Sequence, residues 1–183
     1  VTAFAAGCPV IVKPASTTPL SCLAFVEIMK EAGVPEGWIQ SIITDNESAE
    51  TMVKDSRVNF LSFIGSAKVG WYLKSQVADG TRVAMEHGGA APVIVEMDAD
   101  LEDMIPALTK GGFYHAGQVC VSVQKVFVHE DIAREVAERI AKEAKKLIVG
   151  DPLDKKTEVG PLILPKEVDR IEEWVNEAKE SGA

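Results

Sequence analysis

Short apolar segments alternate with amphipathic ones along the chain. Segments rich in β-branched or aromatic residues predict strands at residues 8–14, 38–44, 58–65, 81–86, 92–97 and 124–130. Apolar residues at helical spacing predict helices at residues 16–37, 47–55, 67–78, 98–115, 131–150 and 165–183. Because the connections are short, this order predicts βαβ units on a parallel sheet, and therefore an α/β fold.

Details of the second half of the chain refine this picture. Pro106 is expected to interrupt helix 98–115, because proline lacks the N–H that the helix needs. In helix 131–150, Ile132, Val136 and Ile140 form one apolar stripe, which is typical of a surface helix. Residues 151–163 predict a long loop.

The pattern changes at the sequence HGGAAP, residues 87–92. A glycine pair followed by proline is typical of a joint between packed elements. We therefore predict two domains, one over residues 1–86 and one over residues 87–183.

Composition narrows the range of partners. The 183 residues carry 28 acidic and 19 basic side chains, so a surface with net charge −9 should repel nucleic acid and anionic membranes. No apolar run approaches the roughly 20 residues that span a bilayer, and no segment resembles a secretory signal. We expect neither a nucleic-acid nor a membrane partner, and a cytoplasmic location.

The cysteines and histidines do not predict a metal site. Cys8, Cys22 and Cys120 are too few and too scattered for a disulfide framework or a paired Cys-x-x-Cys site. The three histidines have no spacing typical of metal ligands. The sequence predicts no metal and a reducing compartment.

One cysteine stands in a sequence that suits chemistry. In FYHAGQVCVSVQ, residues 113–124, Cys120 follows a glycine-containing turn whose backbone N–H groups could stabilise its thiolate. The flanking Val119 and Val121 are also typical of a buried, inert cysteine, and burial statistics favour that interpretation. The residues alone leave both interpretations open.

Other candidate residues stand at the ends of predicted strands. Glu86, beside two glycines, is placed to act as a general base in a cleft at the carboxyl edge of a parallel sheet, or to be a solvated surface glutamate. Gly65 and Ser66 lie at a strand-to-helix turn that could hold a pyrophosphate, although such residues are also routine helix caps. Lys13, at the end of the first strand, could contact a ribose or phosphate or simply be solvated.

Taken together, these segments resemble the aldehyde dehydrogenase superfamily. VIVKPASTTPL, FIGSAKVG, MEHGGAAPVIV and AGQVC occur in that family's order and approximate spacing, followed by GDPLDKKTEVGPLI. The resemblance covers essentially the whole chain. It implies parts of a Rossmann-like cofactor domain and of an α/β catalytic domain, a small aldehyde as substrate, and a homo-oligomeric full-length protein.

The resemblance also implies roles for single residues. Cys120 matches the nucleophile and Glu86 the base that activates water to hydrolyse a thioester. Lys13 and Ser66 match contacts to the adenosine ribose and the pyrophosphate of NAD or NADP. Ser16 stands where strictly NAD-dependent members commonly carry a glutamate, so we expect NADP to be tolerated. Gly88 and Gly89 would let the chain pass close to the cofactor.

The resemblance leaves two alternatives. The family's asparagine oxyanion donor and its segment of the EEIFGP type fall outside these 183 residues, so the chain is expected to be a central fragment. On its own it could be a nucleotide-binding fragment without turnover. The protein could also be of the acylating type, in which coenzyme A rather than water releases the thioester.

Overall fold

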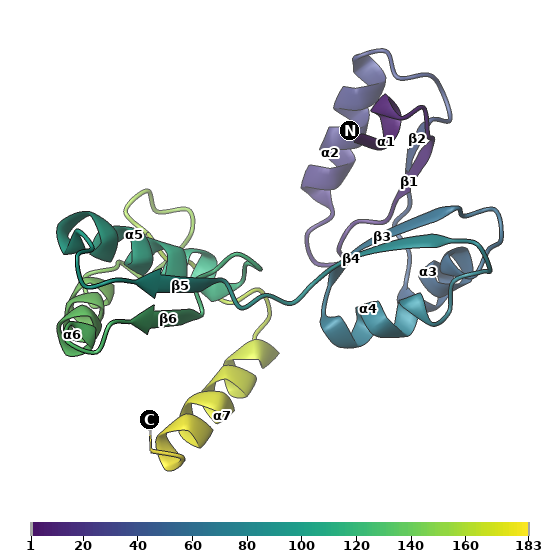
Figure 1. Cartoon of the computed structure of the whole chain (residues 1–183). Coiled ribbons are helices and arrows are strands. Elements are labelled where there is room, and N and C mark those ends of the chain that lie inside the picture. Colours follow the sequence, from purple (N-terminus) through teal and green to yellow (C-terminus); the bar gives the residue numbers. More distant parts are fainter. Residues whose placement is uncertain (1, 183) are drawn as a thin grey trace. The chain divides into compact units, whose positions relative to one another are not determined.

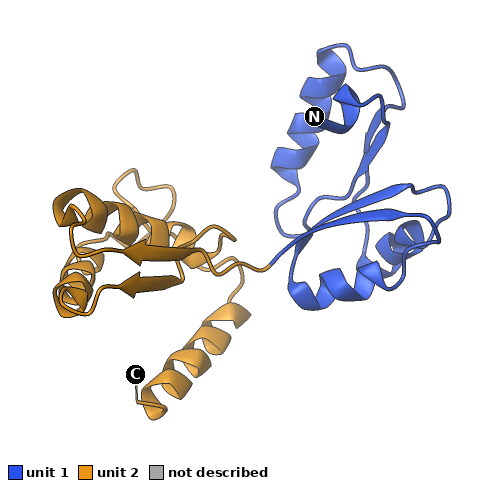
Figure 2. Cartoon of the chain, in the orientation of Figure 1, with its two compact units in different colours: residues 1–87 blue, residues 88–183 orange. Residues whose placement is uncertain are grey.

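The structure, a computed structural model, describes residues 2–182. The described chain divides into two compact units between His87 and Gly88 (Figure 2). Val1 and Ala183, the end residues of the predicted domains, lie outside the described residues. That these units are parts of a cofactor domain and a catalytic domain stays a prediction.

The first unit contains strands and helices in alternation (Figure 1). Its elements are α1 (Thr2–Ala5), β1 (Val10–Val12), α2 (Leu20–Glu31), β2 (Ile39–Ser41), α3 (Asn46–Val53), β3 (Phe60–Gly65), α4 (Ala67–Lys74) and β4 (Arg82–His87). The strands form two parallel pairs, β1 with β2 and β3 with β4. Each pair is joined by a crossover that contains a helix, as parallel strands require.

Three buried apolar side chains mark the core of the first unit, Val26 of α2, Ile39 of β2 and Val53 of α3. A hydrogen bond of 2.8 Å from the Tyr72 hydroxyl to the Glu50 carboxylate connects α4 to α3. Lys54 and Tyr72 both donate to that carboxylate and lower the pKa of Glu50. This polar contact ties α4, whose N-terminus belongs to the candidate site, to α3.

The second unit repeats the alternation once and ends in a long helix (Figure 1). Its elements are β5 (Pro92–Val95), α5 (Leu101–Phe113), the 3-10 turn η1 (Tyr114–Gly117), β6 (Lys125–Val128), α6 (Ala133–Ala144) and α7 (Lys166–Glu180). Strands β5 and β6 pair in parallel. The core contains Val95, Ile105, Leu108 and Val136, which lie on β5, α5 and α6.

The parallel strands and alternating helices confirm the predicted α/β class, but several elements differ from the prediction. The strand expected over 38–44 is limited to Ile39–Ser41, and the helix expected over 131–150 is limited to Ala133–Ala144. Helix α5 runs through Pro106 without interruption. The loop 151–163 is not wholly irregular, because Val159 makes an isolated parallel bridge with Val149.

The Asp100 carboxylate explains where α5 begins. It accepts hydrogen bonds from the N–H groups of Glu102 and Asp103, at 2.9 and 3.4 Å, which satisfies donors that the first turn leaves unpaired.

No helix within residues 2–182 is long and apolar enough to cross a membrane. The same residues contain no group of three or more His, Cys, Asp or Glu side chains that could hold a metal ion.

Candidate active site

Cys120 lies in a tight turn of the second unit. The turn spans Val119–Ser122 and is closed by a hydrogen bond of 3.0 Å from the Ser122 N–H to the Val119 carbonyl. Ser122 is buried, with 2% of its surface exposed, whereas Cys120 is exposed. The interpretation of Cys120 as a buried core atom is therefore wrong, because the turn directs burial to Ser122.

The turn is attached to the C-terminal part of α5. The Val123 N–H donates to the Gly111 carbonyl at 3.0 Å. A Cβ at Gly111 would lie 3.1 Å from Cγ2 of Val123, and one at Gly112 would lie 3.7 Å from the Val123 carbonyl oxygen. Gly111 thus lets the segment that follows Cys120 approach the helix closely, whereas a Cβ at Gly112 would make only an ordinary contact.

Gly89 lies close to the Cys120 backbone. A Cβ placed on Gly89 would lie 2.2 Å from the Cys120 carbonyl oxygen and 3.1 Å from its carbonyl carbon. No rotation of a side chain could relieve that overlap, since the opposing atoms belong to the main chain. Gly89 was expected to let the chain pass close to the cofactor, and the structure adds a close approach to the Val119–Ser122 turn.

Glu86 lies near the end of β4 in the first unit. Residues Ile64 and Gly65 of β3 pair with Glu86 and His87 of β4, so the carboxyl ends of the two strands meet at one edge. Glu86 is exposed there, and Ser66 follows directly after β3. The structure therefore brings Glu86, Gly65 and Ser66 together.

Ser66 caps helix α4 and leaves other donors available. Its hydroxyl accepts from the Val69 N–H at 3.4 Å, and its carbonyl accepts from the Gly70 N–H at 2.9 Å. The N–H groups of Ala67 and Lys68 have no partner within the helix, since the first turn has no preceding carbonyls. With the positive end of the helix dipole, these donors make a position suited to an anionic oxygen.

Lys13 and Ser16 follow the other parallel pair of the first unit. Both come after the carboxyl end of β1, where Lys13 is half-buried and Ser16 is exposed. The Lys13 ammonium donates to the Pro14 carbonyl at 3.3 Å. These two residues stand at the end of one strand pair, and Glu86 and Ser66 stand at the end of the other.

The structure gives His87 a packing contact in the first unit. Its ring meets Trp71 edge-on, with 5.0 Å between ring centroids. A Cβ on Gly70 would lie 2.5 Å from Cδ2 of His87. Gly70 thus provides the space for the imidazole, which neither the glycine nor the histidine alone would have indicated.

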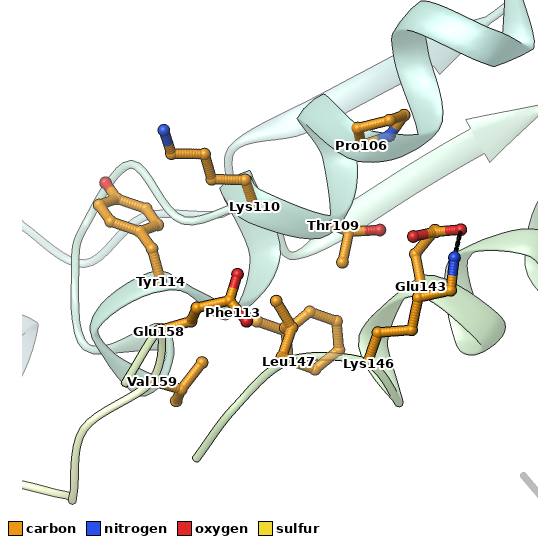
Figure 3. A pocket seen from close by; sticks show the side chains of 10 residues that line it. All are labelled: Pro106, Thr109, Lys110, Phe113, Tyr114, Glu143, Lys146, Leu147, Glu158 and Val159. Carbon is orange, nitrogen blue, oxygen red and sulfur yellow. Dashed lines mark hydrogen bonds and ion pairs between the residues drawn. The ribbon is translucent and has the colours of Figure 1, made fainter. Parts of the chain in front are cut away.

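A cavity of about 600 Å³ lies elsewhere in the second unit (Figure 3). It is lined by residues of α5, of the end of α6 and of the following loops, namely Pro106, Thr109, Lys110, Phe113, Tyr114, Glu143, Lys146, Leu147, Glu158 and Val159. Cys120 is not among them. The cavity therefore does not contain the candidate nucleophile Cys120.

The family model described as "Aldehyde dehydrogenase family" matches residues 1–183. The chain belongs to the aldehyde dehydrogenase family. A relative, 3-sulfolactaldehyde dehydrogenase of Priestia aryabhattai, is 41% identical over 182 residues, which are 99% of this chain and 38% of that protein. The chain thus spans well under half the length of the curated relative.

Solved structures of the family agree with the fold. Glyceraldehyde-3-phosphate dehydrogenase of Methanocaldococcus jannaschii, complexed with NADP, is 39% identical with a TM-score of 0.86, over 94% of this chain and 39% of that one. Betaine aldehyde dehydrogenase of Staphylococcus aureus, in complex with NAD+, is 32% identical with a TM-score of 0.91, over 98% and 36% of the two chains.

The candidate residues lie in both units of the chain. The second unit contains Cys120, and the first unit contains the other candidates, Lys13, Ser16, Gly65, Ser66 and Glu86. The sequence alone suggested no role for Gln118, two residues before Cys120, although Gln118 is part of the segment AGQVC that carried the resemblance.

Proposed function

We propose that the protein to which this chain belongs oxidises an aldehyde to a carboxylic acid, with NAD or NADP as hydride acceptor. The observation that carries the proposal is Cys120, an exposed thiol held in a closed turn, in a chain that matches the aldehyde dehydrogenase family over its whole length. A thiol in that position can reach a substrate without local unfolding.

Cys120 is the nucleophile in this proposal. Its thiolate adds to the aldehyde carbon, so that a C–S bond forms and the carbonyl oxygen gains negative charge. Among residues 2–182, no hydrogen bond uses the Cys120 N–H, so this group is available to donate to that oxygen. Loss of a hydride from the same carbon then converts the adduct to a thioester on Cys120.

Glu86 is the base for the second half of the reaction. Its carboxylate takes a proton from water as the water oxygen attacks the thioester carbon, and the C–S bond breaks to release the acid and the Cys120 thiolate. The exposed position of Glu86 at the carboxyl edge of β3 and β4 supports this role, because water can reach the carboxylate there.

Residues of the first unit would hold the dinucleotide, which supplies the hydride acceptor when bound. The free N–H groups at the start of α4 and the Ser66 hydroxyl suit a pyrophosphate, and Gly65 adds no side chain beside them. The Lys13 ammonium would contact the ribose. Ser16 is exposed and uncharged, so it would not repel a 2′-phosphate, and we expect both NAD and NADP to bind.

The residues beside the nucleophile support a broad substrate class. Val119 is half-buried and Val121 is 64% exposed. Because both side chains are apolar, neither offers a charge to an aldehyde. The names of the relatives include 3-sulfolactaldehyde and betaine aldehyde, which carry opposite charges. We therefore propose aldehydes as the substrate class and name no particular aldehyde. Homo-oligomeric assembly and a cytoplasmic location stay predictions for the whole protein.

Two substitutions in the full-length protein test the two roles separately. Cys120→Ser should lower turnover by at least about 10³-fold, because a weak nucleophile replaces the thiolate. Glu86→Gln should retain a burst of about one equivalent of reduced cofactor and lower steady-state turnover by about 10²-fold or more, because the thioester forms but is not hydrolysed.

The matched control is Cys8→Ser, which removes another exposed cysteine and should leave turnover unchanged. Parent-like turnover of Cys120→Ser would contradict the proposal. A burst abolished in Glu86→Gln would contradict the role of Glu86 in hydrolysis. Restoration of turnover in that variant by coenzyme A would instead indicate the acylating reaction.

A further inference from the structure

The Gln118 side chain connects two segments that are distant in sequence. The Ile163 N–H donates to Oε1 of Gln118 at 2.8 Å. The Gln118 Nε2 group donates to the His115 carbonyl at 2.9 Å and makes a longer contact of 3.5 Å with the Pro161 carbonyl. One carboxamide therefore joins the chain just before Cys120 to residues 161–163.

The backbone that Gln118 supports is strained. His115, Ala116 and Gly117 have φ values of 51°, 55° and 73°, in the left-handed region. Alanine and histidine adopt this region only at a cost, and such residues persist where neighbouring contacts hold them. The His115 carbonyl accepts from both the Gln118 backbone N–H, at 3.1 Å, and the Gln118 side chain, so Gln118 holds this turn from two directions.

The hydrogen bonds require both halves of an amide. Oε1 must accept from Ile163, and Nε2 must donate to carbonyl oxygens. An ionised glutamate offers acceptors only, asparagine is shorter by one methylene group, and methionine keeps a similar length without these hydrogen bonds. The contact pattern is therefore specific to glutamine at this position.

We propose that Gln118 is a positioning residue for the Cys120 nucleophile. By fixing residues 115–117 and the segment 161–163 to each other, it sets the direction from which the chain enters the Val119–Ser122 turn. The inference rests on the proposed function of Cys120. Gln118 does not itself touch the reacting atoms in this assignment.

The test compares Gln118→Met with Gln124→Met in the full-length protein. Gln124 is also an exposed glutamine near Cys120, and its side chain makes no hydrogen bond among the described residues. Six quantities are measured for each variant. They are kcat and KM for an aldehyde such as propanal, the dissociation constant of NADP, the rate at which iodoacetamide alkylates Cys120 relative to Cys8 and Cys22, the thermal midpoint, and the rate of hydrogen exchange at the Ile163 amide.

We expect Gln118→Met to lower kcat by about tenfold to 100-fold, because a displaced nucleophile loses its alignment with the carbonyl carbon. The relative alkylation rate of Cys120 should change with it, whereas NADP affinity and the thermal midpoint should stay close to those of Gln124→Met. Hydrogen exchange at the Ile163 amide should become faster, since its acceptor has been removed.

Two results would overturn the inference. One is unchanged kcat and Cys120 alkylation in Gln118→Met. The other is a parallel loss of kcat, NADP affinity and thermal midpoint, which indicates general destabilisation. Cys120→Ser separates this failure from failure of the proposed function. If Cys120→Ser is inactive and Gln118→Met is fully active, only the positioning role is wrong, whereas an active Cys120→Ser removes the basis of both.

Discussion

The two regions that carry the candidate residues are built differently. In the first unit, Glu86, Gly65 and Ser66 stand at the ends of paired strands and the start of a helix. In the second unit, Cys120 stands in an irregular turn held by main-chain contacts. A glycine makes a close approach in each region, Gly70 to a side chain and Gly89 to the backbone.

This difference predicts unequal tolerance to change. An imidazole that opposes an added methyl group can rotate or shift, so the region around α4 and β4 can absorb a substitution at modest cost. A carbonyl group can move only if the main chain moves. The Val119–Ser122 turn should therefore be the less tolerant region, and three substitutions test this in order of expected effect.

The largest effect is expected for Gly89→Ala in the full-length protein. Its Cβ would lie 2.2 Å from the Cys120 carbonyl oxygen, which forces the turn to move. We expect a loss of about 3 kcal/mol in the free energy of unfolding, and a fall of at least about 100-fold in kcat. Urea unfolding and steady-state kinetics measure the two.

The control for Gly89→Ala is Gly112→Ala in helix α5. A Cβ there meets only the Val123 carbonyl oxygen, at an ordinary contact of 3.7 Å. This variant should be more stable by up to about 1 kcal/mol, because alanine is the better helix former. Equal effects of the two substitutions would mean that the close approach at Gly89 does not constrain the turn.

An intermediate effect is expected for Gly70→Ala in α4. The added methyl group would displace the His87 ring from its edge-on contact with Trp71, at a net cost of about 1 kcal/mol after the helix propensity of alanine is included. In a His87→Ala background, the same change should become stabilising by about 0.5–1 kcal/mol. A double-mutant cycle by urea unfolding measures the difference, and the same cost in both backgrounds would contradict the account.

The smallest effect is expected for Ser66→Ala, which removes the N-cap of α4. The cap bond is long, at 3.4 Å, so we expect a loss of about 0.5–1 kcal/mol in stability and a weaker NADP affinity by several-fold. Asp45→Ala removes the N-cap of α3, whose bond to the Ser48 N–H is 2.8 Å, and should lower stability without changing NADP affinity. If isothermal titration shows equal NADP affinities in the two variants, the start of α4 does not bind the dinucleotide.

The regular parts of the molecule could be predicted from the sequence. Segments rich in β-branched or aromatic residues indicated every described strand, and the alternation with helices indicated parallel pairing. The prediction of family membership is confirmed by the match over residues 1–183. The ends of the elements were less predictable, because α6 stops at Ala144 although its apolar pattern continues through Leu147 and Ile148.

The Val119–Ser122 turn could not be predicted from local sequence. Val119 and Val121 suggested burial of Cys120, but Ser122 takes the buried position, with 2% of its surface exposed. The contact between Gly89 and Cys120 and the bond from Ile163 to Gln118 join residues separated by more than 30 positions. A single sequence contains no periodic signal for such contacts, and the catalytic roles of Cys120 and Glu86 stay predictions.

The most direct test of the central claim is the rate at which iodoacetamide alkylates each cysteine in the native full-length protein at pH 7, resolved by peptide mass. Cys8 and Cys120 are both exposed, so exposure alone predicts similar rates. A nucleophile held in the Val119–Ser122 turn should react at least about tenfold faster than Cys8. Alkylation of Cys120 at or below the rate of Cys8 would contradict the account.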